Sequence, residues 1–587
     1  MASVIETSHT TDSSRRGSPD VELPGNSTPP DTLQSTPHSD ASAVQQFTDH
    51  QSRELPHSRL MVVFPVLALA QFTAYLDQTS ISSVVPAIGD ALDLGASLPW
   101  VATSYLLATT AVQLANGRLS DIFGRKRLLI TSLVVLAIGN LVAGFATSPG
   151  MLFAFRAVSG LGGGAITALV MIIASDVTTL QQRGKYNGFI GAAVACGSGM
   201  GPLIGGAITT HVSWRWTLWY DVPWLVILIM LLYMVLPGGP KGVNTRSKMR
   251  MIDWAGLFIS IAAIVLLVIP LSRGGTTISW GSAQAIAMLV VGAFLILIFL
   301  AVEGRFASLP IMPLHLFTAD FSCNLLLIQN VLYGFVFWGN LFYMPIYLEN
   351  VRGYTPILAG AIIMPMVGTQ GIGSIISGLI ISRTGHYNHV MITSQFLWMA
   401  GLIGQIFYSA TTPIWVVCFV GFFQGLGTGG CFQPSLVALL AHSRRADRAV
   451  LNSLRNFLRT MGGTLGLTVS GTILNNMLQS QLKGVVSKGI ATQLAASAHS
   501  IDSLGLTGAQ RAAVLDAYMH GIHIIFIVYA PLVGICGLGA LLVRDHGLAE
   551  KDTSATLQVR SEKTGNVTDV SSASTPIYTN EVAAGSK

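Results

Sequence analysis

Fourteen long apolar segments leave this chain few possible folds. Each is close to the roughly 20 residues that a helix needs to cross about 30 Å of hydrocarbon. Within lipid only helices and closed barrels satisfy every backbone hydrogen-bonding group, and segments of this length predict helices. The segments run approximately over residues 60–85, 99–119, 127–146, 151–175, 188–209, 218–236, 254–270, 285–302, 325–347, 358–381, 391–410, 414–440, 457–474 and 521–542.

Composition excludes a soluble protein of this length. Hydrophobic residues make up 51% of the chain and charged residues 10%, whereas an ordinary soluble domain has roughly 25% charged residues. The net charge of +6 does not indicate nucleic-acid binding, because no aromatic-basic patch accompanies the basic residues. The five cysteines lie in or beside apolar segments without metal-like spacing. We therefore expect no metal site and no cofactor.

The distribution of basic residues predicts the orientation in the membrane. Alternate loops hold most of them, at 125–127, 183–185, 241–250 and 444–448. By the positive-inside rule these loops are cytosolic, and an even number of helices places both termini in the cytosol as well. The termini are rich in Ser, Thr and Pro, which indicates disorder. The glycosylation motifs at Asn26 and Asn566 would then carry no glycan.

Glycine motifs indicate two related halves. GLGTGG at 425–430 fits the dinucleotide-binding fingerprint, but it lies inside an apolar segment with no strand before it, so we exclude nucleotide binding. A near copy, GLGGG, occupies 160–164. The same spacing in sequence relates Gly197 and Gly201 to Gly462 and Gly466. Such repeats are typical of secondary transporters, in which glycines let helices pack closely.

The domain organisation follows from this repeat. Six segments precede the basic loop at 241–250 and six follow residue 325, so the seventh and eighth are inserted between the halves. We predict a cytosolic tail at 1–58, a six-helix bundle at 59–238, a linker with two extra transmembrane helices at 239–320, a six-helix bundle with a large outer loop near 475–520 at 321–545, and a second cytosolic tail at 546–587.

Several motifs resemble those of the major facilitator superfamily, and within it the fourteen-helix drug:proton antiporters. GRLSDIFGRK at 117–126 is similar to the signature loop between helices two and three, and GSGMGPLIGG at 197–206 to the antiporter motif of helix five. SWRWTLWYDVP at 213–223 resembles a motif of the fourteen-helix branch, although the family more often has Asn at the position of Asp221. The resemblance implies an all-α polytopic membrane protein with two six-helix bundles, two additional helices between them and 14 transmembrane helices.

Two charged residues inside apolar segments are candidates for proton coupling. Asp77 lies about 12 Å below the outer end of the first segment, and Arg156 about 7 to 8 Å below that of the fourth. Ionisable residues inside membrane helices usually face a cavity or a partner and mark ion pathways. We expect Asp77 and Arg156 to form a pair, which either couples proton movement to transport or ties the helices together.

The resemblance also implies roles for the two glycine-rich motifs. The signature loop would latch the outward-open state; its residues are Gly117, Arg118, Asp121, Gly124, Arg125 and Lys126. The antiporter motif would be associated with export; its residues are Gly197, Gly201, Pro202, Gly205 and Gly206. Tight helix packing without any directional meaning is the alternative for the second motif.

Polar and aromatic residues recur at helical spacing in the ninth segment, namely Asn330, Tyr333, Phe337 and Asn340. Such a face suits a cavity for amphipathic organic molecules, and buried helix packing is the alternative. Near the cytosolic end of the thirteenth segment, Arg455 and Arg459 are expected to extend toward the cytosol.

Together these features predict a proton-coupled antiporter that exports drugs, toxins or secondary metabolites by alternating access. The partners are the lipid bilayer, protons and a small organic substrate, and the protein is a monomer and not an enzyme. We expect it in the plasma membrane. One alternative is a vacuolar or other organellar importer of amino acids or other small metabolites, and a second is a non-transporting membrane sensor.

Overall fold

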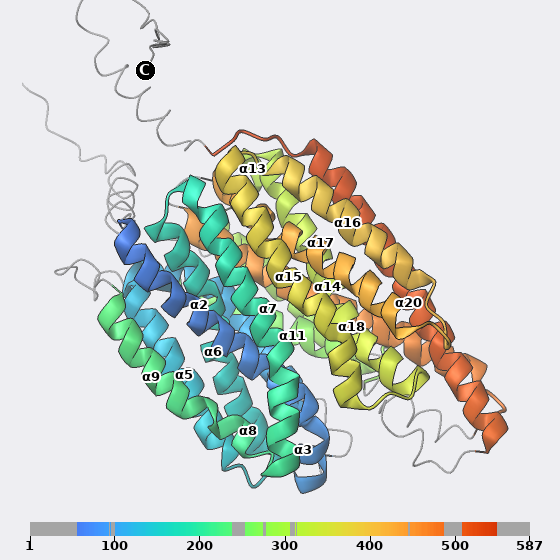
Figure 1. The fold of residues 1–587 in the computed structure, drawn as a ribbon. Coiled ribbons are helices and arrows are strands. Elements are labelled where there is room, and N and C mark those ends of the chain that lie inside the picture. Colours follow the sequence, from blue (N-terminus) through green and yellow to red (C-terminus); the bar gives the residue numbers. More distant parts are fainter. Residues whose placement is uncertain are drawn as a thin grey trace, which may run out of the picture. The chain divides into compact units, whose positions relative to one another are not determined.

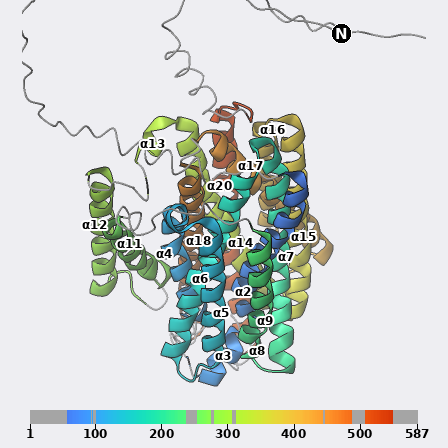
Figure 2. The same cartoon turned by 90° about the vertical axis from the view of Figure 1, so that its left-hand side faces the viewer.

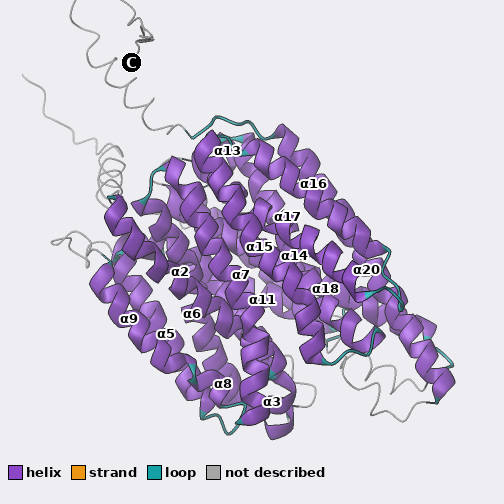
Figure 3. Ribbon diagram, viewed as in Figure 1, coloured by secondary structure: helices purple, strands orange, loops and turns teal. Residues whose placement is uncertain are grey.

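The structure is a computed structural model that describes residues 56–92, 94, 100–236, 253–273, 278–305, 312, 314–443, 447–486 and 507–548. Throughout these residues the chain forms helices and loops and no β-sheet (Figure 3). Most of the two predicted tails, with the glycosylation motifs at Asn26 and Asn566 and the basic loop at 241–250, lies outside the described residues.

Six long helices form the first half of the fold (Figure 1). They are α2 (His57–Ser80), α4 (Trp100–Phe123), α5 (Arg125–Gly144), α6 (Pro149–Val177), α7 (Leu180–His211) and α9 (Asp221–Val235). Three short elements join them, namely the 3-10 turn η1 (Ile81–Ser83), α3 (Val85–Leu92) and α8 (Trp216–Trp219).

The second half also contains six long helices, preceded by two inserted ones. The inserted helices are α11 (Trp254–Arg273) and α12 (Ala283–Arg305). The six are α14 (Phe321–Ile346), α15 (Pro356–Thr384), α16 (Asn388–Ile406), α17 (Ile414–Ala441), α18 (Arg448–Gln481) and α20 (Gly508–Leu542), with the short α13 (His315–Ala319) and the π-helical turn η3 (Tyr347–Val351). Each of the fourteen predicted segments therefore coincides with one long helix.

Eleven helices in the described part of the chain are long and apolar enough to cross a membrane. The long helices α4, α16 and α18 are more polar and fall outside that set. Their polar side chains are buried in the protein, among them Thr109 and Asn116 on α4 and Asn452 and Asn456 on α18. Hydrogen-bonded polar groups can be kept between helices without contact with lipid, so the total is consistent with fourteen spans.

The two halves repeat the same packing. The glycines Gly197 and Gly201 bring α7 against α2, and Gly462 and Gly466 bring α18 against α14 in the same way. Because a missing side chain lets two backbones approach closely, the matching glycines place the fifth helix of each half on the first. The structure thus confirms the repeat inferred from the glycine spacing.

The glycines of GLGTGG also serve packing. They lie in the middle of α17, and a Cβ atom added to Gly427 would lie 2.5 Å from the backbone nitrogen of Trp398 on α16. That position is occupied by a neighbouring helix, which leaves no room there for a dinucleotide.

The inserted helices lie at the side of the fold, where α11 packs on α4 and α18 (Figure 2). On α12, Val290, Phe294 and Leu297 are each more than half exposed, whereas Phe299 is buried. An exposed apolar face of this kind is unfavourable in water and suits contact with lipid tails.

Helix boundaries differ from the prediction around the last two helices. The thirteenth segment was expected near residue 457, but α18 begins at Arg448 and runs to Gln481. Since α20 already begins at Gly508, helix occupies part of the large loop predicted near 475–520. Hydropathy misses the start of α18 because its polar residues are buried by other helices rather than exposed to lipid.

Candidate functional site

Asp77 and Arg156 meet in a buried polar cluster in the first half. The Arg156 Nη1 atom lies 3.5 Å from Oδ1 of Asp77. Asn140 donates a 2.8 Å hydrogen bond to the same oxygen, and Ser159 donates a 2.7 Å bond to Oδ1 of Asn140. All four residues are at most 1% exposed. The pair expected from the sequence is present, and Asn140 and Ser159 join it.

This cluster is incompletely hydrogen-bonded. The Arg156 guanidinium stacks over the Tyr105 ring, 4.6 Å from its centroid. Its Nε and Nη2 atoms are buried without a hydrogen-bond partner, as is Oδ2 of Asp77. Buried polar groups are nearly always satisfied, so each exception calls for an explanation such as an unseen water, an ion or a proton.

Asp221 brings a second buried carboxylate to the same cluster. It is the first residue of α9 and is fully buried. The neighbouring Tyr220 hydroxyl interacts with its carboxyl. Its carboxyl interacts electrostatically with both Asp77 and Arg156. With both carboxyls ionised the cluster would carry one net negative charge, and a single bound proton makes it neutral. The signal in the sequence was an Asp where the resembling family more often has Asn.

The signature loop is held by ion pairs at one end of the first half. Gly124 separates α4 from α5 with φ 87°, a backbone conformation that favours glycine. Arg125 contacts Asp121 at 2.5 Å and Asp176, at the end of α6, at 2.7 Å. Arg118 lies 3.8 Å from Asp121. These pairs fix the ends of three helices relative to one another.

The same loop anchors α9 and touches the second half. Lys126 donates 2.6 Å hydrogen bonds to the carbonyls of Tyr233 and of Leu236, the residue that caps α9, where a cation also complements the helix dipole. A Cβ atom added to Gly117 would lie 2.9 Å from the carbonyl oxygen of Ala449 and 3.0 Å from Cα of Val450. The signature motif therefore packs directly on the beginning of α18.

The antiporter motif packs mainly against the first helix. Cβ atoms added to Gly197 and Gly201 would lie 2.6 Å and 2.9 Å from backbone atoms of α2, and one on Gly205 would also meet that backbone. Gly206 has more space, and Pro202 lies within the continuous helix α7. All five residues lie on α7, and three of them, Gly197, Gly201 and Gly205, pack closely against the first helix, whereas Gly206 has no close contact of this kind.

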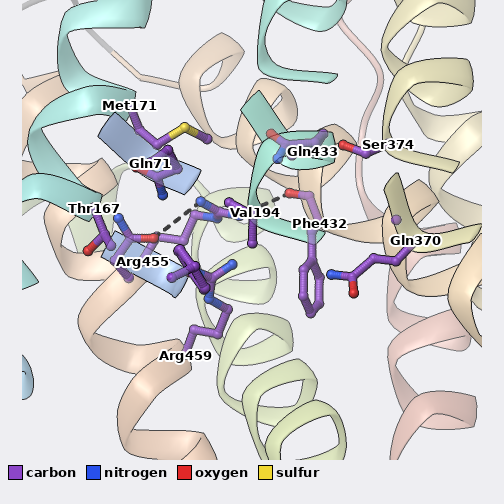
Figure 4. Close-up of a pocket in the computed structure, with 14 residues that line it drawn as sticks. Gln71, Thr167, Met171, Val194, Gln370, Ser374, Phe432, Gln433, Arg455 and Arg459 are labelled. Carbon is purple, nitrogen blue, oxygen red and sulfur yellow. Dashed lines mark hydrogen bonds between the residues drawn. The ribbon is translucent and has the colours of Figure 1, made fainter. Parts of the chain in front are cut away.

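A polar pocket lies between the two halves (Figure 4). Residues of α2, α6 and α7 line it from the first half, and residues of α15, α17 and α18 from the second. Most of the lining side chains are amides, hydroxyls or small residues, and two are arginines, Arg455 and Arg459. Among the described residues that line this pocket, none is acidic.

The prediction that Arg455 and Arg459 extend toward the cytosol is wrong. Both line the pocket, and Arg455 is 1% exposed. Arg455 lies seven residues, about 10 Å, inside α18, because that helix begins at Arg448. Its guanidinium donates to Asn330, to Asn456 and to the Phe432 carbonyl, so polar acceptors inside the protein replace water.

The polar-aromatic face of α14 lies behind this pocket. Asn330 accepts a hydrogen bond from Arg455, and the Phe337 ring packs on the Phe432 ring with 5.2 Å between the ring centroids. Tyr333 is buried, and Asn340 bonds two glutamines of the second half at 2.7 Å. Within the described residues none of the four lines this pocket, and Asn330, Tyr333 and Asn340 are buried between helices. A substrate cavity on this face stays a prediction.

A cluster not expected from the sequence lies beside α14, α16 and α17. Ligand-type atoms of Asp320, His442 and His546 lie within 4.8 Å of one another. His442 contacts Asp320 through Nδ1 at 2.7 Å and the carbonyl of Arg544 through Nε2 at 2.9 Å. Burial raises the pKa of Tyr387, whose hydroxyl donates to the same carbonyl. The cluster ties the segment after α20 to the second half.

Known sequences resemble this chain over most of its length. A family model described as the Major Facilitator Superfamily matches residues 67–388 and 326–479. Citrate exporter 1 of Yarrowia lipolytica is 37% identical over 551 residues, covering 91% of this chain and 81% of that protein. Efflux pump dotC of Dothistroma septosporum is 35% identical over 402 residues, covering 68% of this chain and 69% of that protein.

Solved structures share the fold at low sequence identity. The proton:xylose symporter XylE superposes with a TM-score of 0.55 at 13% identity, covering 85% of this chain and 99% of that one. The human organic anion transporter MFSD10 gives a TM-score of 0.54 at 12% identity, covering 83% of this chain and all of that one. Such similarity shows the fold alone.

Proposed function

The chain belongs to the major facilitator superfamily of membrane transporters, and from that membership we propose that it is a proton-coupled antiporter exporting small organic molecules by alternating access. The relatives named as a citrate exporter and an efflux pump support export over import. The proposal includes the plasma membrane as its location, cytosolic termini and a monomeric state.

The observation that carries the proton coupling is the cluster of Asp77, Arg156 and Asp221. A second buried carboxyl, that of Asp221, interacts electrostatically with the Asp77–Arg156 ion pair, and burying an uncompensated charge is costly. In one conformation the cluster holds a proton and is neutral. When the conformational change opens a water path to the cluster, ionising the second carboxyl costs less free energy, so the proton leaves. The exchange of proton and substrate is thereby linked to the conformational change.

The two glycine motifs have different parts in this mechanism. The packing of Gly117 on the start of α18, together with the Asp121–Arg125–Asp176 pairs, closes the cytosolic side. The close packing of Gly197 and Gly201 holds α7 on α2 within the first half, so these two helices move together as the halves rock. Small residues at such contacts let two backbones pack closely.

The proton gradient supplies enough free energy for this exchange. One proton entering through a potential of about 100 mV releases roughly 2.3 kcal/mol, and one pH unit adds about 1.4 kcal/mol. The sum of roughly 3.7 kcal/mol sustains a concentration ratio of a few hundred for a neutral solute.

The test profiles metabolites in cells and medium of a deletion strain that expresses the wild type, Asp77→Asn or Asp221→Asn at equal levels. The matched control is Asp516→Asn, whose carboxylate is exposed on α20. We expect the wild type and the control to restore one exported compound in a protonophore-sensitive manner, and both cluster variants to fail. Export at the wild-type rate by both cluster variants would contradict the proposed coupling site.

A further inference from the structure

The pocket between the halves contains two positive charges and no counter-charge among its described lining residues. Arg455 and Arg459 lie one helical turn apart on α18 and both face the pocket (Figure 4). The Arg459 guanidinium acts electrostatically on that of Arg455, and like charges this close repel each other. A pocket built in this way favours an occupant of negative charge.

Arg455 is positioned rather than neutralised by its neighbours. Its Nε donates to Oδ1 of Asn330 at 3.2 Å, Nη1 to Oδ1 of Asn456 at 3.4 Å, and Nη2 to the Phe432 carbonyl at 3.0 Å. All three acceptors are uncharged. A guanidinium has five N–H groups in a planar fork, so each terminal nitrogen keeps a second N–H, and a carboxylate matches this geometry.

Arg459 is held loosely beside it. Its Nη2 donates a long 3.4 Å hydrogen bond to the Tyr75 hydroxyl of α2, and its guanidinium lies 5.3 Å from the centre of the Phe432 ring. Neither contact supplies a negative charge. Among the described residues, the Arg459 guanidinium makes only this one hydrogen bond, so its other N–H groups remain available to a ligand.

Further polar groups of the pocket lack partners. The Oε1 atoms of Gln71 and Gln433 and the Oγ atom of Ser374 are buried without a hydrogen-bond partner, and the three residues are at most 6% exposed. They lie on α2, α17 and α15, and Figure 4 shows Gln433 and Ser374 next to each other and Gln71 apart from them. Buried polar atoms of this kind are satisfied when a polar ligand is bound.

We propose that the exported substrate is a small organic anion whose carboxylate groups bind Arg455 and Arg459 and whose other polar groups bind the amides and hydroxyl around them. This inference rests on the proposed export function and names its substrate class. Carboxylates satisfy the guanidinium forks, and hydroxyl substituents satisfy the unpartnered amide oxygens. An apolar cationic drug would instead meet two like charges in this pocket.

Substrate and proton sites share one helix. Tyr75, which bonds Arg459, and Asp77 of the proton cluster are two residues apart on α2. An anion that draws Arg459 away from the Tyr75 hydroxyl removes a hydrogen bond between α18 and α2, the helix that carries Asp77. In this proposal, substrate binding acts on the proton site through α2.

The test measures binding to the purified full chain in lipid nanodiscs. The probes are propane-1,2,3-tricarboxylate and its uncharged triamide, and the readout is the thermal unfolding midpoint at increasing probe concentration. We expect the tricarboxylate to stabilise the wild type and the triamide to have no effect. Because a hydrogen bond to a charged group is worth roughly 1.5–3 kcal/mol, Arg459→Gln should weaken apparent binding about tenfold or more.

Two further variants keep the test decisive. Arg383→Gln removes an exposed arginine outside the pocket and should bind the tricarboxylate like the wild type. Arg455→Lys keeps the charge without the planar fork and should bind more weakly. Equal stabilisation by the triamide, or unchanged binding by Arg459→Gln, would overturn the assignment.

Transport assays separate this inference from the proposed function. If proteoliposomes carry the tricarboxylate without any dependence on a pH gradient, the substrate class stands and the proton coupling is wrong. If instead a pH gradient drives only neutral molecules and Arg459→Gln leaves their transport unchanged, the coupling stands and the anion pocket is wrong.

Discussion

Replacing Arg156 by Gln should destabilise the protein more than any other single change in the proton cluster. The guanidinium lies 3.5 Å from the Asp77 carboxylate, and at an effective dielectric constant of 20 two unit charges at that distance attract by about 5 kcal/mol. Measured losses for removing one partner of a buried ion pair are about 3–5 kcal/mol. The variant also loses the stacking on Tyr105 and leaves two carboxyls without a cation.

The Asp77→Asn variant provides the internal comparison. It removes one of two carboxyls, and Asp221 remains as a counter-charge for Arg156. The cluster then has one positive and one negative group, so Asp77→Asn should lower the free energy of unfolding less, by about 1–2 kcal/mol for the altered hydrogen bonds. The order of stability is therefore wild type, then Asp77→Asn, then Arg156→Gln.

The assay is thermal unfolding of purified protein, followed by tryptophan fluorescence at pH 7.5 and pH 5. Protonating the carboxyls removes the uncompensated negative charge left by Arg156→Gln. The difference in unfolding midpoint between this variant and the wild type should therefore shrink at the lower pH. The Asp77→Asn deficit should change less. Equal midpoints for Arg156→Gln and the wild type at pH 7.5, or a deficit that grows at pH 5, would refute this account of the cluster.

Three other predictions concern the second carboxylate, the latch and the orientation. Asp221→Asn should retain the fold but lose export driven by an imposed pH gradient, as measured in proteoliposomes; export that still follows the gradient would count against a shared proton. Gly117→Leu should abolish transport, because its side chain would clash with the backbone of α18. Gly124→Ala has open space around it but φ of 87°, so it should lower the free energy of unfolding by only about 1 kcal/mol and keep transport. Equal transport by both variants would argue against the latch. Enzymatic deglycosylation should leave the electrophoretic mobility unchanged, because Asn26 and Asn566 are expected in the cytosol, and a shift would place a tail outside.

The tertiary structure changes the roles of several residues that the sequence had singled out. The α14 face with Asn330 and Phe337 repeats at helical spacing, a pattern that buried packing and a binding cavity share. The arrangement of α17 and α18 bears on the choice, because Phe432 and Arg455 line the pocket and also contact that face. Periodicity reports which side of a helix is polar, and it does not report what stands opposite.

The sequence alone determined the helical membrane fold, the two related halves and the Asp77–Arg156 pair. Long apolar segments have no other stable arrangement in lipid, and glycine spacing marks where backbones touch. Only the tertiary structure decided that Asp221 joins that pair and that Arg455 faces a pocket instead of the cytosol. Those outcomes depend on which helices pack together, because the environment of a charged group is set by residues far away in the chain.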